Sequence, residues 1–272
     1  MKQRWYIAGG GLLALAAWLL LALLWPAPGR PAAEEAVQAA LSTKVQAPQR
    51  EVLPVQAEEP EPYVSPVDFE SLWAVNEDIY AWLYIPGTEV SYPLLQREGD
   101  DGYYLSRNSQ GETDKNGSLF TESAYNSKDF SDPVTVVYGH HMRSGAMFGN
   151  LQADYASGDF SGERGEVMVY LPKEEICYRV FAGVPYSGTH ILYYYDFSIP
   201  VVYEAFLDQI FSTRGLNANI REDAEVTPED QLLILSTCLQ GNNKRRYLVL
   251  AQRVDDRDTA QITESPRKEA SS

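Results

Sequence analysis

The sequence predicts a mainly β protein whose short strands form a closed or nearly closed barrel. Between residues 67 and 254, short runs rich in β-branched and aromatic residues alternate with turn signals, and helical periodicity is confined to two segments. Many short strands with few helices are typical of β-barrels. This length of chain is enough for a single domain with a sizeable core.

The chain begins with a candidate membrane span. Residues 5–25 form an uncharged apolar run behind Lys2 and Arg4. A helix of this length, at about 1.5 Å per residue, spans a hydrocarbon core of roughly 30 Å. The run is longer than the roughly 7–15 residues usual in a cleaved signal peptide, which is the competing interpretation. The sequence therefore favours an uncleaved anchor, with residues 1–4 in the cytoplasm and the rest of the chain outside.

Residues 26–66 predict a spacer between this span and the folded domain. They hold half of the 16 prolines, together with Ala, Gln and Glu and few large apolar residues. Such a segment cannot bury enough surface to offset its ordering entropy, and its prolines favour extended conformations. The charged residues 255–272 predict a disordered tail. The folded domain is therefore expected at residues 67–254.

The first part of the domain is expected to contain one helix and two short strands. The helix is expected to end before Pro86, because apolar residues recur at helical spacing up to that point, namely Phe69, Leu72, Trp73, Ile79, Tyr80 and Leu83. Residues 90–95 predict a strand, with Pro93 favouring an edge position or a bulge. A loop is expected at 99–117 with a brief element at 103–105, and residues 118–121 predict the next strand.

The second part of the domain predicts further strands and a second helix. Residues 133–138 should form a buried strand, and Gly139 would let the chain turn sharply after it. Residues 166–171 and 176–184 alternate as in a hairpin. In the long connection that follows, residues 199–211 have one apolar helical face, with Pro200 in the first turn.

The last predicted hairpin carries a thiol and a guanidinium at one end. Two apolar runs, residues 232–235 and 247–254, flank a polar loop with the turn residues Gly241–Asn243. Cys238 follows the first run and Arg246 opens the second, so antiparallel pairing would bring them together. A reactive thiol needs help to form its thiolate and a positive group for the oxyanion it creates. Arg246 can supply that charge, and Arg245 competes for the role.

Three histidines are the candidates for proton transfer near neutral pH. His140 and His141 follow the strand at 133–138, and since adjacent residues of an extended chain point to opposite faces, only one of them can face the thiol. His190 lies in a polar stretch and is expected to be an exposed loop residue. No metal site is predicted, because a third and fourth ligand at known zinc spacing are missing.

Two other residues near these candidates have competing interpretations. Cys177 lies within a predicted strand, where a small buried thiol is ordinary, but the cysteine count alone favours a disulfide in a protein outside the cytoplasm. Ser236 shares the strand face of Cys238 by alternation. It could bind substrate there or be a structural hydroxyl.

These motifs together resemble the sortase family, and their flanks resemble class B. The resemblance rests on YGHHM with a following MFGNL, on LSTC, and on an arginine that opens a hydrophobic strand. The segment DFESLWAVNEDIYAWLYIPGTEVSYPLLQ resembles the class B amino-terminal helix and first strand. A helix before the cysteine strand, as expected at 199–211, is also a class B feature. The match covers roughly Val67 to Val254, and His141 departs from it where family members often have Asn.

The resemblance implies a sortase-type closed β-barrel of about eight strands and a cysteine transpeptidase that needs no cofactor. It implies that Cys238 is the nucleophile, His140 the proton donor and acceptor, and Arg246 the group that stabilises the oxyanion. The implied substrates are surface or pilin proteins with a carboxy-terminal sorting motif, cleaved after Thr through a thioacyl intermediate. The implied acceptor is an amine of a peptidoglycan precursor or a pilin lysine. With the anchor, this describes a single-pass membrane protein whose catalytic domain lies outside the cytoplasm.

Two other functions remain alternatives at this point. A secreted papain-like cysteine peptidase would carry its cysteine near the start of the mature domain and ahead of the histidine, whereas here His140 precedes Cys238. An anchored binding module would contain Cys238 only as a structural thiol. Nucleic acid is disfavoured as a partner, since the net charge of −16 would repel phosphates.

Overall fold

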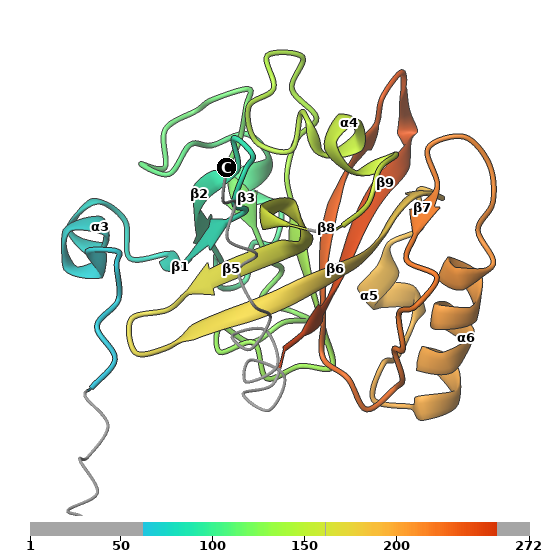
Figure 1. The fold of residues 1–272 in the computed structure, drawn as a ribbon. Coiled ribbons are helices and arrows are strands. Elements are labelled where there is room, and N and C mark those ends of the chain that lie inside the picture. The colour runs from blue at the N-terminus through green and yellow to red at the C-terminus, as the bar shows by residue number, and fades with distance from the viewer. Residues whose placement is uncertain (1–61, 161, 255–272) are drawn as a thin grey trace, which may run out of the picture. The chain divides into compact units, whose positions relative to one another are not determined.

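The computed structural model describes residues 62–160 and 162–254 (Figure 1). Its helical elements are α3 (Phe69–Val75), η1 (Tyr103–Leu105), α4 (Leu151–Tyr155), η2 (Glu163–Gly165), α5 (Ile191–Tyr194) and α6 (Pro200–Phe211). Its strands are β1 (Ile79–Tyr84), β2 (Ser91–Leu95), β3 (Leu119–Phe120), β4 (Val134–Tyr138), β5 (Glu166–Tyr170), β6 (Glu175–Tyr186), β7 (Asn219–Ile220), β8 (Leu232–Leu239) and β9 (Asn242–Arg253).

Some of the expected segments lie outside the described residues. These are the membrane span at 5–25, most of the spacer at 26–66, and the tail at 255–272. Among residues 62–160 and 162–254, none of the helices has the length and apolar character needed to cross a membrane.

Eight strands within the described residues form a closed ring. The ring runs β1, β2, β3, β4, β8, β9, β6 and β5, and β5 closes it by pairing with β1. The two-residue strand β7 adds to β6 outside this ring. The prediction of a closed, mainly β barrel is therefore confirmed. Most neighbouring pairs are antiparallel, but β2–β3 and β4–β8 are parallel.

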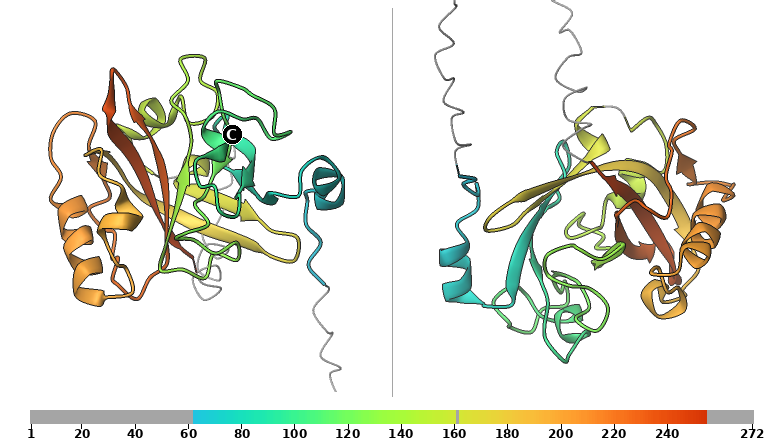
Figure 2. Two further views of the ribbon diagram at one scale, coloured as in Figure 1. Left: turned by 180° about the vertical axis from the view of Figure 1, so that it is seen from behind. Right: turned by 90° about the horizontal axis from the view of Figure 1, so that it is seen from below.

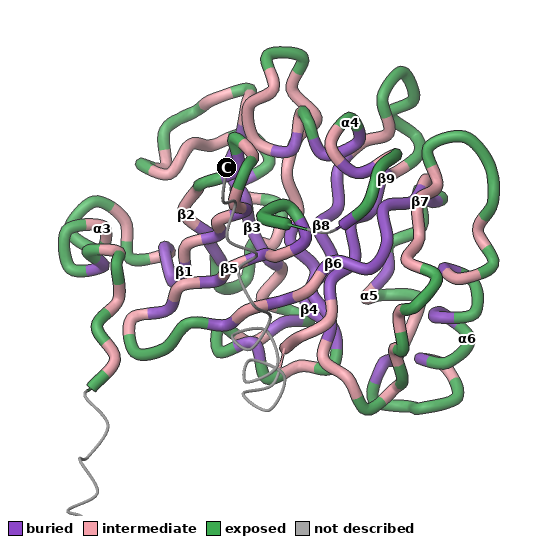
Figure 3. Tube along the Cα trace, viewed as in Figure 1, coloured by how far each residue is buried: buried purple, intermediate pink, exposed green. Residues whose placement is uncertain are grey.

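Alternation along the strands of the ring produces two packed faces. On β4, β8 and β9, the inner side chains include Val137, Leu235 and Val249, which belong to the main core cluster. The opposite face carries Val136, Ile234 and Leu248, and α6 covers this face with Tyr203, Phe206 and Ile210. Figure 2 shows α6 outside the ring on the side of β9, and Figure 3 shows buried residues concentrated on the strands.

The first helix is shorter than expected, and residues assigned to its second half form a strand. Helix α3 begins after Asp68, whose carboxylate accepts a hydrogen bond from the Ser71 amide, and ends at Val75. Asn76 then adopts an extended backbone, and its side chain donates to the Tyr104 hydroxyl and to the Ser109 carbonyl at 2.9 Å each. The apolar residues beyond it belong to β1, which is paired on both sides, so tertiary pairing overrides the helical spacing.

The other expected elements are present, whereas α4, α5, η2 and β7 were not expected, and β8 and β9 are longer than the apolar runs that predicted them. Two prolines fit their positions in these elements. Pro93 precedes Leu94 and Leu95, which are the only β2 residues paired with β3. Its missing amide hydrogen therefore leaves the β2–β3 ladder intact. Helix α6 starts at Pro200, where the fixed φ of proline suits the first turn.

Candidate active site

The neighbouring parallel strands β4 and β8 bring His140 and Cys238 to one end of the sheet. Strands β4 and β8 pair in register from Val134 with Leu232 to Tyr138 with Ser236. The ladder continues for one more residue, because the Gly139 amide donates to the Ser236 carbonyl at 3.1 Å. His140 and Cys238 each follow the last register pair by two residues, so they occupy equivalent positions on neighbouring strands.

Gly139 has a different role from the sharp turn that the sequence suggested. Its φ is not in the left-handed region, and it remains in the ladder with β8. A Cβ at this position would lie 2.4 Å from Leu119 Cδ2 and 2.6 Å from Phe148 Cδ2. Gly139 is therefore required for close packing beneath His140 rather than for backbone freedom.

Cys238 and Arg246 are partners across the antiparallel β8–β9 pair. Arg246 Nη1 donates to Cys238 Sγ at 3.3 Å and also to the Asn243 carbonyl at 3.3 Å. Arg245 is exposed, and its Nε donates to the Tyr186 carbonyl at 3.4 Å on the other side of β9. The geometry therefore separates the two arginines, and it is Arg246 that accompanies the thiol.

The ring of His140 is held by a backbone carbonyl. His140 Nε2 lies 2.7 Å from the Leu105 carbonyl oxygen. Since a carbonyl can only accept, Nε2 carries a proton, and Nδ1 is the nitrogen left for proton exchange in the neutral ring. Gly117 makes this approach possible, because a Cβ there would lie 2.6 Å from the Tyr104 carbonyl oxygen and 3.1 Å from His140 Cδ2.

The two remaining histidines, His141 and His190, lie in different environments. The Nδ1 atom of His141 is buried and makes no hydrogen bond to a described residue, and burial lowers the pKa of this histidine. His190 is exposed as expected, yet both of its ring nitrogens are bonded, one to the amide of Tyr193 and the other to Glu122. Glu122 gave no recognisable signal in the sequence, because it lies 68 residues before its partner.

The two cysteines are both free, so the disulfide alternative is wrong. Cys177 lies on β6 and is half-buried, and burial raises the pKa of its thiol to about 11. This thiol is therefore protonated at neutral pH and a poor nucleophile. Ser236 is buried on β8, on the face that carries Cys238.

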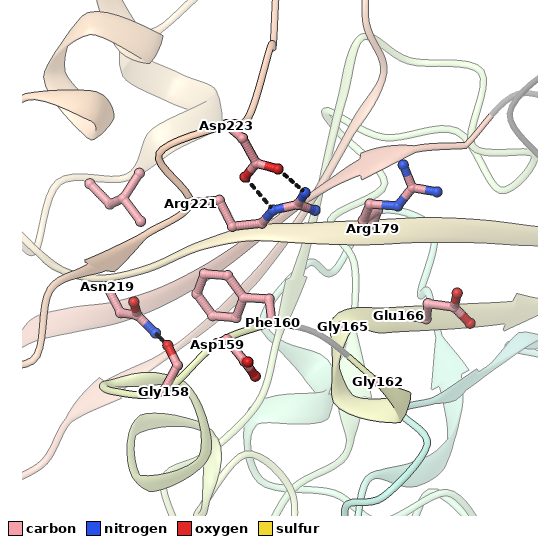
Figure 4. A pocket seen from close by; sticks show the side chains of 11 residues that line it. Gly158, Asp159, Phe160, Gly162, Gly165, Glu166, Arg179, Asn219, Arg221 and Asp223 are labelled. Carbon is pink, nitrogen blue, oxygen red and sulfur yellow. Dashed lines mark hydrogen bonds and ion pairs between the residues drawn. The ribbon is translucent and has the colours of Figure 1, made fainter. Parts of the chain in front are cut away.

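A cavity of about 570 Å³ lies away from these residues (Figure 4). Neither Cys238, His140 nor Arg246 lines it. Its charged residues are of mixed sign, and Arg221 donates to both carboxylate oxygens of Asp223, at 3.2 and 3.0 Å. Within the described part of the chain, no group of three or more His, Cys, Asp and Glu side chains could hold a metal ion.

Comparison with known proteins identifies the family. A model described as Sortase domain matches residues 83–254. Sortase B of Listeria monocytogenes is 32% identical over 179 residues, which cover 63% of this chain and 67% of that relative. A crystal structure of sortase B complexed with triglycine is 28% identical, with a TM-score of 0.58, and covers 69% of this chain and 86% of that chain. The Staphylococcus aureus sortase B–substrate complex is 29% identical, with a TM-score of 0.57, and covers 69% and 85%.

The chain belongs to the sortase family and, within it, to class B. Members of this class are cysteine transpeptidases that act in sorting proteins to the cell wall, so the chain is an enzyme of this type. The papain-like peptidase and the non-catalytic binding module are thereby set aside.

Proposed function

We propose that this sortase cleaves a carboxy-terminal sorting signal after Thr and joins the new carboxyl end to an amine of a cell-wall precursor or to a pilin lysine. The observation that carries this proposal is the hydrogen bond from Arg246 Nη1 to Cys238 Sγ, formed next to the strand end that bears His140. Related sortase B structures contain a substrate in one case and triglycine in another. These complexes support a peptide donor and an amine acceptor for the present chain.

The first half of the proposed reaction forms a thioester. The Cys238 thiolate attacks the carbonyl carbon of the Thr residue, and the Arg246 guanidinium stabilises the resulting oxyanion. The tetrahedral intermediate collapses with cleavage of the C–N bond, and protonated His140 donates its proton to the departing amine. The products are a thioacyl enzyme and the released carboxy-terminal fragment.

The second half of the proposed reaction transfers the acyl group. The acceptor amine attacks the thioester carbonyl, and His140 removes the proton that the amine loses as the new amide forms. The Cys238 thiolate then leaves with its electron pair, and the enzyme is restored. Arg246 stabilises the second oxyanion as it did the first. We also assign Ser236, two residues before Cys238 on the same face of β8, to substrate binding.

The proposed setting of this reaction is the outer face of the cell membrane. The apolar run at 5–25 would be the anchor, residues 26–66 the spacer and residues 67–254 the catalytic domain. The basic residues Lys2 and Arg4 support a cytoplasmic amino terminus.

The experiment that tests the proposed function is a ligation assay. The purified chain is incubated with a panel of sorting peptides that contain a Thr, with and without amine acceptors, and the products are identified by mass spectrometry. The proposal expects a product that joins the Thr carboxyl to the added amine, and more of it than of the hydrolysed peptide. Cleavage at another residue, or hydrolysis that added amines do not divert, would overturn it.

A further inference from the structure

His190 and Glu122 join two segments that are far apart in the sequence. His190 Nε2 lies 2.9 Å from Glu122 Oε1, and His190 Nδ1 accepts a hydrogen bond of 3.1 Å from the Tyr193 amide at the start of α5. Because Nδ1 is the acceptor, the neutral ring carries its proton on Nε2 and donates it to Glu122. Through these two hydrogen bonds, the imidazole links the beginning of α5 to the segment that follows β3.

The short segment Ser187–His190, here called the strap, crosses β8. Just before the strap, Tyr186 pairs with Arg246 on β9. Within it, Gly188 packs against β9, since a Cβ there would lie 2.4 Å from the Lys244 carbonyl oxygen. At its end, the His190 ring lies 6.2 Å from the ring of Tyr138 on β4. Strand β8 lies between β4 and β9 in the sheet. A segment that contacts both neighbours therefore passes over β8.

The strap crosses on the face that carries the candidate site. Tyr138 is the register partner of Ser236, and paired residues of parallel strands point to the same side of a sheet. Cys238 and its partner Arg246 share this side by alternation. Ser236 beneath the strap is only 3% exposed, and Cys238 is half-buried. The strap therefore lies on the same face of the sheet as the thiol.

The contacts beneath the strap are buried and polar. Glu122 Oε2 and the Tyr138 hydroxyl oxygen are both buried, and the two side chains are close enough to interact. Burial, and then the neighbouring Glu122 carboxylate, raise the pKa of Tyr138. The Glu122 side chain is 14% exposed and that of His190 is 38% exposed, so solvent screens their attraction only in part.

We propose that Glu122 and His190 form a latch that positions the strap over the candidate site and thereby sets how tightly the sorting peptide is held. This inference rests on the proposed function. Neither residue is assigned to the reacting atoms, so both are positioning residues. Opening the latch should raise the KM for the sorting peptide and leave kcat nearly unchanged, because Cys238, His140 and Arg246 keep their places.

The test uses two variants that open the latch in different ways. Asn at position 190 can still cap α5 through its side-chain oxygen but is too short to reach Glu122, so His190→Asn separates the latch from the helix cap. Glu122→Ala removes the other partner. Glu122→Gln retains an acceptor for His190 and serves as the rescue variant. Asp223→Ala breaks the Arg221–Asp223 pair of 3.0 Å in the same connection and is the matched control.

The first measurement is the rate at which iodoacetamide alkylates Cys238 in the full chain, with Cys177 as the internal reference. Loss of one partly exposed pair should speed Cys238 alkylation about fivefold in His190→Asn and in Glu122→Ala. Because the pair is one interaction, the double variant should show no further increase. Glu122→Gln and Asp223→Ala should stay within about twofold of the unaltered protein. This measurement needs no sorting activity, so it decides the latch even if the proposed function fails.

The second measurement is steady-state cleavage of a sorting peptide by the same variants. An increase in KM of about fivefold, with kcat within about twofold, is expected for the two latch variants and not for Asp223→Ala. Unchanged Cys238 alkylation in both latch variants would overturn the latch. So would a loss confined to kcat. If Glu122→Ala does not fold, as judged by circular dichroism, His190→Asn alone decides.

Discussion

Cys238 and Arg246 face each other across the β8–β9 ladder, with Arg246 Nη1 donating to Cys238 Sγ at 3.3 Å. A guanidinium in this position can meet an oxyanion formed on a carbonyl that the sulfur attacks. The neighbouring Arg245 is directed to the Tyr186 carbonyl instead. The two adjacent arginines therefore provide an internal comparison.

Replacement of each arginine by lysine should separate their roles. Lysine offers a flexible point charge in place of a planar fork, so Arg246→Lys is expected to lower kcat/KM by about 10²-fold or more. Arg245→Lys should change kcat/KM little. Steady-state kinetics with a cleavable sorting peptide measures both, and the reverse ranking would move the oxyanion role to Arg245.

Replacement of Gly117 should disturb His140 through the backbone that holds it. Gly117 has a φ of +61°, and a Cβ would meet the Tyr104 and Leu105 carbonyl oxygens at 2.6 and 2.9 Å. Gly117→Ala should therefore displace the Leu105 carbonyl from His140 Nε2. Because the His140 ring then loses the orientation needed for proton transfer, kcat/KM is expected to fall by about tenfold.

A second glycine of the same loop supplies the control for this change. Gly99 has a φ of +73° but open space within 4 Å of its Cβ position. Gly99→Ala should cost about 1–2 kcal/mol of stability through left-handed strain, with kcat/KM retained. Thermal unfolding and kinetics of both variants are the measurements. Equal kcat/KM for the two would show that Gly117 does not act through His140.

The two thiols should differ in how their alkylation depends on pH. Burial raises the pKa of Cys177 to about 11, so its thiolate fraction is small at neutral pH and grows as the pH rises toward that value. Alkylation of Cys177 by iodoacetamide is therefore expected to be slow at pH 7 and to increase about tenfold per pH unit up to pH 10. Mass spectrometry of the labelled peptides follows this directly. Rapid labelling of Cys177 at pH 7 would contradict the protonated state assigned to it.

The apolar run at residues 5–25 predicts that the full-length protein fractionates with membranes. Protease added outside protoplasts should cut in the segment at 26–66 and release a soluble catalytic domain. The amino terminus of the mature protein is the decisive readout. A protein that begins after residue 25 would establish signal-peptide cleavage instead of an anchor.

Much of the barrel could be predicted because its strands have local signals. The run at 134–138 and the hairpin at 232–253 are marked by β-branched residues, alternation and turn residues. The first has nearly the expected bounds, but both strands of the hairpin extend further toward the turn than the runs at 232–235 and 247–254, so Cys238 and Arg246 lie within them. The first helix was predicted too long, because the residues of β1 also fit a helical spacing. Pairing with β2 and β5 decides the conformation of the β1 residues, and a local pattern of apolar residues cannot reveal such pairing.

The candidate site shows the same division between local and distant information. Alternation and strand ends placed Cys238 opposite Arg246, since both residues belong to one hairpin. The Leu105 carbonyl that holds His140 and the Glu122 carboxylate that holds His190 come from other segments. A carbonyl is present at every residue and an acidic side chain is common on any surface, so neither has a sequence signature.

The most direct test of the central claim, that Cys238 is the nucleophile of a transpeptidase, is to trap the acyl enzyme. The unaltered protein, Cys238→Ala and Cys177→Ala are each incubated briefly with a sorting peptide, quenched in acid, digested and analysed by mass spectrometry. We expect the amino-terminal peptide fragment, ending in Thr, as a thioester on Cys238 in the unaltered protein and in Cys177→Ala. Addition of an amine should discharge it into the ligated product. Turnover by a folded Cys238→Ala variant, or an acyl group found on Cys177 instead, would contradict the claim.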